Sequence, residues 1–268
     1  MKKEIFNTGE RVSPDAMNNF AQLINFKKHF FAYSSVQQFI KHKEASILEV
    51  GFGEGYGTAF LGKEGFFVTA VDIDQNLCKY AKEKYNSMKN ISFITAQANI
   101  LDFPNNSFDT VISFQVIEHT EDLTQFLSEI HRVLKKGGLF ICTTPNRLLR
   151  LSKHQKPWNQ YHVQEFKAID LQKKMLSLFS DVAVYGVFGS KKMHKFHYAN
   201  MYYLRKKNIG ELFNPYFYSF TLCRIMKKIG LSNSNYVSYN NKQIEKEEFY
   251  LKNKKIDKSL DVFIVSKK

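Results

Sequence analysis

Short apolar runs alternate along the chain with segments in which apolar residues recur at helical spacing. A helix is expected between the fourth and fifth runs, where five apolar residues share one face: Leu123, Phe126, Leu127, Ile130 and Leu134. Alternation of this kind is typical of an α/β fold with a doubly wound sheet and helices on both faces. The runs predict seven strands, near residues 46–50, 66–71, 91–95, 109–114, 138–143, 182–187 and 261–265.

The helix between the fourth and fifth strands is expected to end at two lysines followed by two glycines. Lys135 and Lys136 would lie in its last turn, where cations suit the helix dipole. Gly137 and Gly138 follow, and glycine suits the left-handed residue that ends many helices.

The strongest chemical signal follows the first predicted strand. Residues 47–57 read Ile-Leu-Glu-Val-Gly-Phe-Gly-Glu-Gly-Tyr-Gly, and the second predicted strand is followed by Asp72. Backbone can approach a ligand closely at Gly51, Gly53 and Gly55 because these residues lack a side chain. The N–H groups that open the next helix would face an anionic group. Asp72 can accept hydrogen bonds from both hydroxyls of a ribose, so the segment suits a nucleoside cofactor.

The glycine spacing distinguishes between two classes of nucleoside cofactor. A dinucleotide-binding loop requires a third glycine or alanine three positions after the second, and Tyr56 and Thr58 stand at the two available positions. The pattern present is Glu-x-Gly-x-Gly-x-Gly, which begins at Glu49 and resembles the first motif of the class I S-adenosylmethionine (SAM) methyltransferases. This resemblance implies SAM as the cofactor, with Glu49 and the three glycines at its methionine part and Asp72 on its ribose.

The resemblance also implies a Rossmann-like, seven-stranded, mostly parallel sheet with an antiparallel last strand. We expect a helical cap over residues 1–44, a SAM-binding core over 45–190, a helical insertion over 191–256 and the final core strand within 257–268. The insertion separates the last two strands by roughly 70 residues, far more than a hairpin loop. Because it is aromatic and basic, we interpret it as a lid over the substrate site; a membrane-surface or partner-binding role is the alternative.

Two further stretches resemble cofactor-binding parts of this family. Residues 96–109 resemble a signature whose first acid contacts the adenine amino group, and Gln97 stands in that place. Its carbonyl can still accept the hydrogen bond. The fourth strand ends in Phe114 and Gln115, which are expected to border the methionine moiety. We add Ile73 and Ala98 to this cofactor-binding set.

The N-terminal segment offers basic residues for the cofactor carboxylate. Residues 8–14, Thr-Gly-Glu-Arg-Val-Ser-Pro, resemble an element that precedes the glycine loop in some bacterial methyltransferases. In those enzymes the leading helices close over the cofactor, which implies that Arg11, Lys28 or His29 reaches its carboxylate. The alternative is an ordinary solvated face.

Two histidines are candidates for the general base. Glu118 and His119 resemble the Glu-His pair after the family's fourth strand, and a histidine, with an ordinary pKa of about 6.5, suits proton removal from an acceptor hydroxyl. Residues 158–166 resemble an element of methyltransferases that act in bacterial surface-glycan and small-molecule pathways. It makes His162 a second base candidate and places Trp158 and Tyr161 at the acceptor. The alternatives are a structural role for His119 and core packing for the aromatic residues.

Composition and charge bear on the partners, metal content and cellular location of the protein. The net charge of +14 indicates an anionic partner such as nucleic acid, a membrane surface or an acidic glycan, or else reflects a lysine-rich proteome. Three cysteines without a Cys-x-x-Cys pair argue against disulfides and zinc, and we take Glu165 near His162 as accidental, so no metal site is predicted. No segment reaches the apolar length of a membrane span and no signal-peptide pattern opens the chain, so we expect the cytoplasm.

The interpretation that follows is a SAM-dependent methyltransferase that methylates a hydroxyl of a small-molecule or glycan acceptor. RNA or protein methylation is the alternative that the charge suggests, although the chain lacks the Asn-Pro-Pro-Tyr-type signature of base amino methylation. A non-catalytic protein that binds SAM or a partner is a further alternative, and a homodimer is considered for the assembly.

Overall fold

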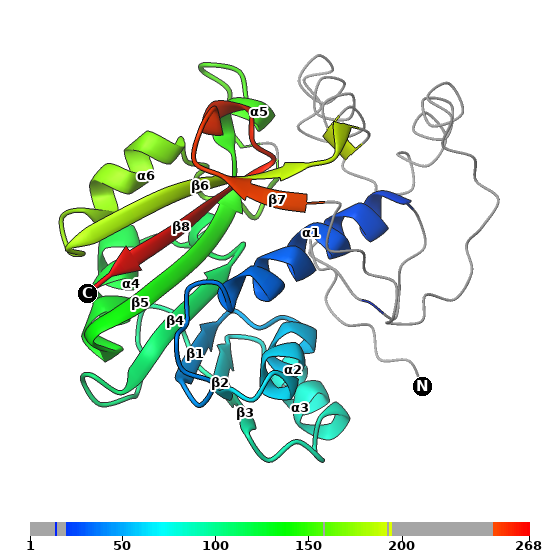
Figure 1. Ribbon diagram of the computed structural model, residues 1–268, viewed down its shortest axis with the longest axis vertical. Coiled ribbons are helices and arrows are strands. Elements are labelled where there is room, and N and C mark those ends of the chain that lie inside the picture. The colour runs from blue at the N-terminus through cyan, green and yellow to red at the C-terminus, as the bar shows by residue number, and fades with distance from the viewer. Residues whose placement is uncertain (1–13, 15–19, 158, 192, 195–248) are drawn as a thin grey trace.

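The seven predicted strands are present, and an eighth joins them. The computed structural model describes residues 14, 20–157, 159–191, 193, 194 and 249–268 (Figure 1). The strands are β1 (Ser46–Val50), β2 (Phe67–Asp72), β3 (Ile91–Thr95), β4 (Phe108–Phe114), β5 (Leu134–Pro145), β6 (Asp181–Gly189), β7 (Phe249–Lys252) and β8 (Asp261–Lys267).

The sheet has the order β3-β2-β1-β4-β5-β8-β6-β7. The strands β1 to β5 run parallel to one another, whereas β8 lies antiparallel between β5 and β6. The predicted α/β fold with a mostly parallel sheet and an antiparallel last strand is therefore confirmed. The eighth strand, β7, pairs with β6 at the edge of the sheet. It comes from residues that the sequence pattern placed inside the 191–256 insertion.

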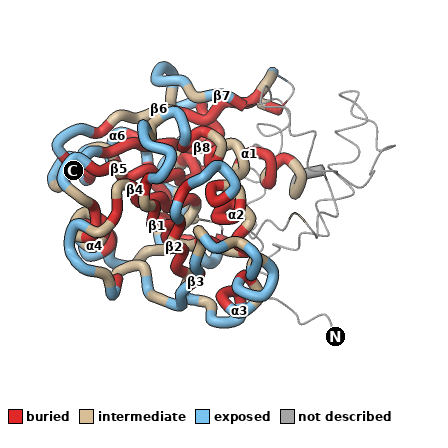
Figure 2. The backbone as a smooth tube through the Cα atoms, turned by 60° about the horizontal axis from the view of Figure 1, so that its bottom comes forward, coloured by how far each residue is buried: buried red, intermediate tan, exposed pale blue. Residues whose placement is uncertain are grey.

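Helices cover both faces of the sheet, as expected. Two buried clusters lie on opposite faces, one beneath α1 and α2 and the other beneath α4 and α6. Alternate residues of the inner strands enter the two clusters: Ile47 packs on one side and Leu48 on the other. Buried backbone therefore follows the strands through the middle of the molecule (Figure 2). The helices are α1 (Phe20–Val36), α2 (Tyr56–Lys63), α3 (Gln75–Lys84), α4 (Leu123–Val133), α5 (Arg147–Arg150) and α6 (Ala168–Met175), with 3₁₀ turns η1 (Ile117–His119) and η3 (Ile256–Lys258).

The strand order reverses between β1 and β4. From β1 the chain proceeds to β2 and β3 on one side, and it then crosses to β4 and β5 on the other. The loops that follow β1 and β4 therefore diverge and leave a crevice at the carboxyl ends of the strands, where ligands bind in open α/β sheets.

The helix α1 lies within the predicted N-terminal cap and packs along α2 (Figure 1). Its aromatic side chains meet those of α2: the Phe30 and Phe60 rings are 4.8 Å apart, and the Phe26 and Tyr56 rings 5.3 Å apart. Aromatic pairs at such distances add to the energy of burial. No helix among the described residues is long and apolar enough to cross a membrane.

The end of α4 differs from the sequence expectation. The helix stops at Val133, and β5 begins at the next residue, so Lys135 and Lys136 lie in a strand. Lys135 instead pairs with Asp109 of β4 at 2.8 Å. Gly137 does take a left-handed conformation, with a φ of 77°, but it does so inside the long β5. The helix ends early because Leu134, the residue after Val133, already pairs with Phe108 of β4 in the sheet.

Gly57 supports a test of how α1 is seated. It lies in α2 against Tyr33 of α1, and a Cβ at this position would overlap the Tyr33 ring. That ring is fixed because its hydroxyl donates to Glu49 at 2.6 Å. We expect Gly57→Ala to lower the free energy of unfolding by about 1–3 kcal/mol through overpacking, measured by urea denaturation.

The matched control is Lys63→Ala in the same helix. Lys63 is exposed in the last turn of α2. Substitutions at exposed positions usually change the free energy of unfolding by no more than about 0.5 kcal/mol. This variant should therefore be close to neutral, and an equal loss in both variants would contradict the rigid contact between α1 and α2.

Candidate functional site

The glycine loop joins β1 to α2 at the crevice. Gly51 and Gly55 have φ values of 83° and 76°, which lie in the left-handed region that disfavours other residues. A Cβ at Gly51 would also overlap the Val116 side chain. A Cβ at Gly53, by contrast, would meet no atom within 4 Å, so this turn of the loop faces open space. The loop therefore exposes bare backbone at Gly51 and Gly53, which line the crevice together with Phe52 and Glu54.

Asp72 lies at the end of β2, next to this loop. Its Oδ2 accepts a hydrogen bond from the Gly53 N–H at 3.0 Å, and its Oδ1 accepts one from the Asp74 N–H at 3.1 Å. Asp74 in turn caps α3 by accepting from the Asn76 N–H at 2.9 Å. The carboxylate is thus held between the two loops that lead into α2 and α3.

Glu49 lies beneath the glycine loop. Its carboxylate is buried and accepts hydrogen bonds from the Tyr33 hydroxyl and the Thr58 hydroxyl, each at 2.6 Å. Burial raises the pKa of Glu49 to about 7, although these two hydrogen bonds oppose the rise. The residue joins β1, α1 and α2 behind the wall of the site, so its predicted place among the cofactor-binding residues is an indirect one in this structure.

The end of β4 is held in an unusual conformation. Gln115 has a φ of 57°, which is uncommon for a residue other than glycine. Its N–H donates to the Thr143 carbonyl at 2.9 Å, and its side-chain amide donates to the Thr143 hydroxyl at 3.1 Å and to Asp261 at 3.4 Å. Strained backbone of this kind persists where the surroundings fix it and is common at functional sites.

A buried ion pair seats α1 on the far side of the crevice. Lys28 Nζ lies 2.8 Å from Asp261 Oδ2 at the start of β8, and both side chains are almost fully buried. Because Asp261 also accepts from Gln115, the pair links the cap helix to the strand end that borders the site.

These elements surround a cavity of about 690 Å³. Tyr33 and Arg150, which the sequence pattern did not single out, also line it. Glu49, Gly55 and His162 lie outside its lining, and Arg11 and Trp158 lie outside the described residues. Twelve of the residues singled out from the sequence are on its wall: Gly51, Gly53, Asp72, Ile73, Gln97, Ala98, Phe114, Gln115, His119, Tyr161, Lys28 and His29.

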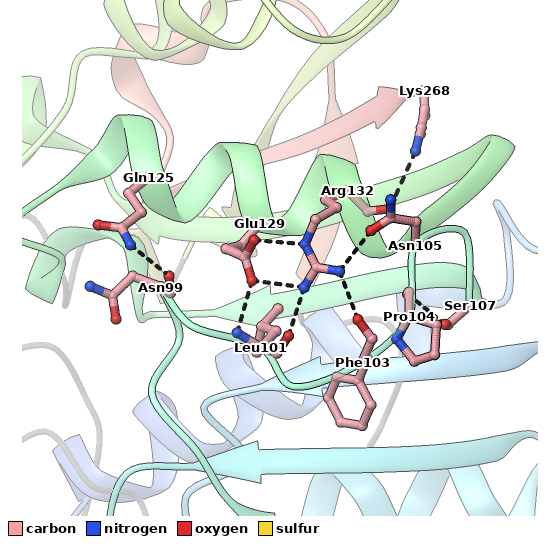
Figure 3. Close-up of polar contacts among 10 residues, drawn as sticks. All are labelled: Asn99, Leu101, Phe103, Pro104, Asn105, Ser107, Gln125, Glu129, Arg132 and Lys268. Carbon is pink, nitrogen blue, oxygen red and sulfur yellow. Dashed lines mark hydrogen bonds and ion pairs between the residues drawn. The ribbon is translucent and has the colours of Figure 1, made fainter.

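The loop after β3, which carries Gln97 and Ala98, is clamped onto α4 (Figure 3). Arg132 donates to the carbonyls of Leu101 and Phe103 at 2.6 and 2.7 Å. It also binds both carboxylate oxygens of Glu129, at 2.7 and 2.9 Å, and Glu129 accepts from the Leu101 N–H at 2.9 Å. The clamp holds this wall of the cavity in place.

His119 is oriented by main chain from a distant segment. Its Nδ1 lies 2.7 Å from the Tyr161 carbonyl oxygen, which can only accept, so Nδ1 carries a proton and Nε2 is the acceptor nitrogen of the neutral ring. The Val163 and Gln164 N–H groups donate to the Glu118 carbonyl at 3.0 and 3.2 Å. The segment around residues 159–165 is therefore fixed against η1.

His162 belongs to a buried charged group. Its Nδ1 lies 2.9 Å from Glu165 Oε1, which also lies 3.1 Å from Arg150 Nε. The His162 and His119 rings are 4.9 Å apart at 80°. Glu165, whose spacing from His162 looks accidental in the sequence, thus orients that ring. The three-residue spacing between the two is visible in the sequence, but Arg150 carries no such signal.

The part of the chain that forms this site is similar to known methyltransferases. Residues 48–142 match a family model described as a methyltransferase domain. A probable S-adenosylmethionine-dependent methyltransferase of Mycobacterium tuberculosis is 33% identical over 190 residues, which are 69% of this chain and 65% of that protein. Residues 48–142 therefore carry a methyltransferase domain of the class I SAM-dependent type, as the sequence pattern predicted. The cofactor of this family is SAM.

Other matches extend over less of the chain or show the fold alone. A demethylmenaquinone methyltransferase of Staphylococcus epidermidis is 31% identical over 150 residues, 53% of this chain and 60% of the relative. The chain thus spans less than two thirds of these relatives. A SAM dependent methyltransferase from Aquifex aeolicus has a TM-score of 0.52 at 19% identity, over 70% of this chain and 95% of that chain. The [4+2]-cyclase SpnF has a TM-score of 0.56 at 14% identity, over 88% and 79%.

The residues around the crevice fit the cofactor of this family. The glycine loop leaves space at Gly53, and Asp72 lies beside it on the wall of a cavity whose volume suits a small ligand.

The raised pKa of Glu49 predicts a pH dependence of stability. The folded protein holds this proton up to a pH near 7, whereas the unfolded chain releases it near 4.5. The stability that the protonated group contributes is therefore complete below pH 4.5 and is lost as the pH rises through 7. Between pH 5.5 and 8.0 this loss should be on the order of 2 kcal/mol.

Glu49→Gln removes the titrating group and keeps its shape. Urea denaturation of both proteins at the two pH values measures the effect, and the variant should lose less stability than the wild type between them. Equal losses would show that Glu49 is ionised in the folded protein at both pH values.

Proposed function

We propose that the protein transfers the methyl group of SAM to a hydroxyl of a small-molecule or glycan acceptor. The observation that carries the proposal is the Asp72 carboxylate, which accepts from the Gly53 N–H at 3.0 Å and lines the cavity of about 690 Å³. A carboxylate at this strand end can hold both hydroxyls of a ribose, and the adjacent loop offers backbone to the rest of the cofactor.

Other lining residues support assignments along the cofactor. Gln97, Ala98 and Ile73 line the wall that follows β2 and β3, which suits the adenine. Ile73 leaves 70% of its side chain exposed, and an aromatic base packed on it would cover apolar surface. Phe114 and Gln115 line the cavity from the end of β4, which suits the methionine part.

We expect the carboxylate of the cofactor to contact basic side chains of α1. Lys28 and His29 both line the cavity from this helix, and Lys28 is held in place by Asp261 at 2.8 Å. Arg11, the third candidate, lies outside the described residues. A cation in this position favours the anionic end of the cofactor over a neutral one.

The reaction needs alignment and one proton acceptor. When bound, SAM supplies a methyl group on a positive sulfur: the acceptor oxygen forms a bond to that carbon, the sulfur–carbon bond breaks with its electron pair kept by sulfur, and S-adenosylhomocysteine leaves. Holding two reactants in line supplies a large part of the rate, about 7–11 kcal/mol for a well-positioned pair. The hydroxyl proton passes to a base.

We assign His119 as the base that accepts this proton. It lines the cavity, and its contact with the Tyr161 carbonyl leaves Nε2 as the acceptor nitrogen of the neutral ring. His162, which is buried, packs against His119 and would support that ring rather than touch the acceptor. The two base candidates from the sequence thus take different roles in this proposal.

The acceptor would enter beside Tyr161, which lines the cavity and keeps 38% of its surface exposed. Its ring suits the apolar face of a sugar or a flat small molecule. Trp158, the other predicted contact, lies outside the described residues, as does most of the insertion that we interpret as a lid. The Staphylococcus epidermidis relative is named for methylating demethylmenaquinone, which gives a small-molecule precedent within the family.

The charge of +14 keeps RNA or protein methylation as the second candidate. A binding protein without transferase activity is the third, since a cyclase shares this fold.

The cytoplasmic location stays a proposal and is supported by Cys78 and Cys142, which are buried as free thiols. Nothing among the described residues bears on a homodimer.

Asp72→Ala tests the cofactor assignment. Each hydrogen bond to a charged group contributes about 1.5–3 kcal/mol, so loss of two should weaken S-adenosylhomocysteine binding about 100-fold or more. Calorimetric titration measures this, with NAD as the control ligand. Asp170→Ala, which removes an exposed carboxylate from α6, is the matched control and should bind like the wild type. Unchanged affinity in Asp72→Ala would overturn the ribose assignment.

His119→Ala tests the chemistry. The variant should keep its affinity for S-adenosylhomocysteine but lose about 10²–10⁴-fold in turnover, the usual contribution of acid–base catalysis. Transfer of labelled methyl groups from SAM into glycan, lipid and RNA fractions provides the assay. Normal turnover in this variant would remove His119 from the reaction, and label found only in RNA would favour the second candidate.

A further inference from the structure

We infer that Glu118, His119 and His162 bind a divalent transition-metal ion beside the acceptor end of the cavity. The three side chains each offer one ligand atom, a carboxylate oxygen or an imidazole nitrogen, and these atoms all lie within 4.8 Å of one another. The sequence predicted no metal site, because the two histidines lie in separate segments of the chain. Tyr161, which directly precedes His162, is 42 positions from His119. The task given to the ion rests on the proposed function; its binding does not.

The hydrogen bonds around the two histidines favour ligation. The Nδ1 of His162 contacts Glu165 at 2.9 Å, and the Nδ1 of His119 contacts the Tyr161 carbonyl at 2.7 Å. Each acceptor oxygen fixes its ring so that Nε2 carries the lone pair. Metal-binding histidines almost always donate their other nitrogen to a carboxylate or a backbone carbonyl in this way.

Glu118 supplies the negative charge of the group. Its side chain is fully buried, and its Oε2 accepts from the Thr144 hydroxyl at 3.0 Å. A buried carboxylate is costly unless charge and hydrogen bonds compensate it. The Arg150 guanidinium lies 3.1 Å from Glu165, and Glu118 adds a second buried carboxylate whose charge a bound cation would offset.

The site is held rigidly enough to act as one unit. Glu118 and His119 are consecutive in η1, and the Val163 and Gln164 N–H groups bind the Glu118 carbonyl at 3.0 and 3.2 Å. These main-chain bonds fix the segment that carries His162 relative to η1. The three ligands therefore come from two distant segments whose relative position is set without the ion.

The ligand chemistry selects the class of ion. Two imidazoles and one carboxylate suit Mn²⁺, Fe²⁺, Co²⁺ or Zn²⁺, whereas Mg²⁺ and Ca²⁺ prefer oxygen ligands throughout. Three protein ligands leave coordination positions for water or an acceptor oxygen. A hydroxyl bound to such an ion would ionise more readily. In the metal-loaded protein His119 would be a ligand of the ion, and its role as the base would apply to the metal-free protein alone.

Cobalt titration of the full-length protein tests the inference. After treatment with EDTA, Co²⁺ is added and followed by its visible absorption and by calorimetry, with Mg²⁺ as the comparison ion. The wild type should bind one equivalent of Co²⁺ and retain it in excess Mg²⁺. His119→Ala and His162→Gln should each lose about 100-fold or more in affinity, and Thr144→Val, which leaves Glu118 without that donor, about 10-fold.

His42→Gln is the matched control, because it removes an exposed histidine far from the cluster in sequence and should bind Co²⁺ like the wild type. S-adenosylhomocysteine titration of each variant reports folding independently. If His162→Gln no longer binds that ligand, the Co²⁺ affinities of His119→Ala and Thr144→Val decide whether the metal site exists.

Two results would overturn the metal site. One is wild-type protein that binds S-adenosylhomocysteine one-to-one but takes up no stoichiometric Co²⁺, which would leave the two histidines as a ring contact only. The other is Co²⁺ affinity that is the same in the wild type and in His119→Ala. Folded wild type that fails to bind S-adenosylhomocysteine would instead overturn the proposed function, whatever its response to Co²⁺.

Discussion

The buried carboxylate of Glu49 is the contact on which the rest of the site depends. It receives the hydroxyls of Tyr33 and Thr58 at 2.6 Å each, and so it joins the central strand β1 to both α1 and α2. The glycine loop lies between those elements, and its Phe52 ring is buried 4.9 Å from the Phe93 ring. The shape of the loop therefore depends on Glu49 beneath it and on the packing of Phe52. Tyr33 also packs against Gly57, the fourth glycine of the motif, where a Cβ would overlap its ring although Gly57 does not line the cavity.

The sequence predicted what depends on local pattern. Apolar periodicity located the strands, and the glycine spacing together with Asp72 identified residues that line the cavity. These features lie within about 30 residues of one another, and each has a direct physical reason. The seven predicted strands form most of the sheet, and the eighth was missed because four residues of β7 pair with β6 from inside an insertion with no regular pattern of its own.

Contacts between distant segments could not be predicted. The pairing of Lys28 with Asp261 joins residues 233 positions apart, and neither has a neighbour that reveals the other. The same holds for Arg150, which reaches the cavity from a four-residue helix, and for the meeting of His119 with His162. The sequence identified these two histidines separately, as alternative bases, whereas the structure brings their rings together with Glu118. A cluster of ligands is a property of the fold rather than of spacing along the chain.

The fold alone does not decide the chemistry, because a cyclase and methyltransferases share it. The proposed chemistry depends instead on one cavity whose lining includes the Asp72 carboxylate beside the glycine loop and the His119 side chain. A crystal structure of the protein with S-adenosylhomocysteine tests this most directly. We predict both ribose hydroxyls on Asp72, the adenine beside Gln97 and the sulfur turned toward His119. A ligand bound elsewhere, or one whose sulfur points away from His119, would contradict the proposal.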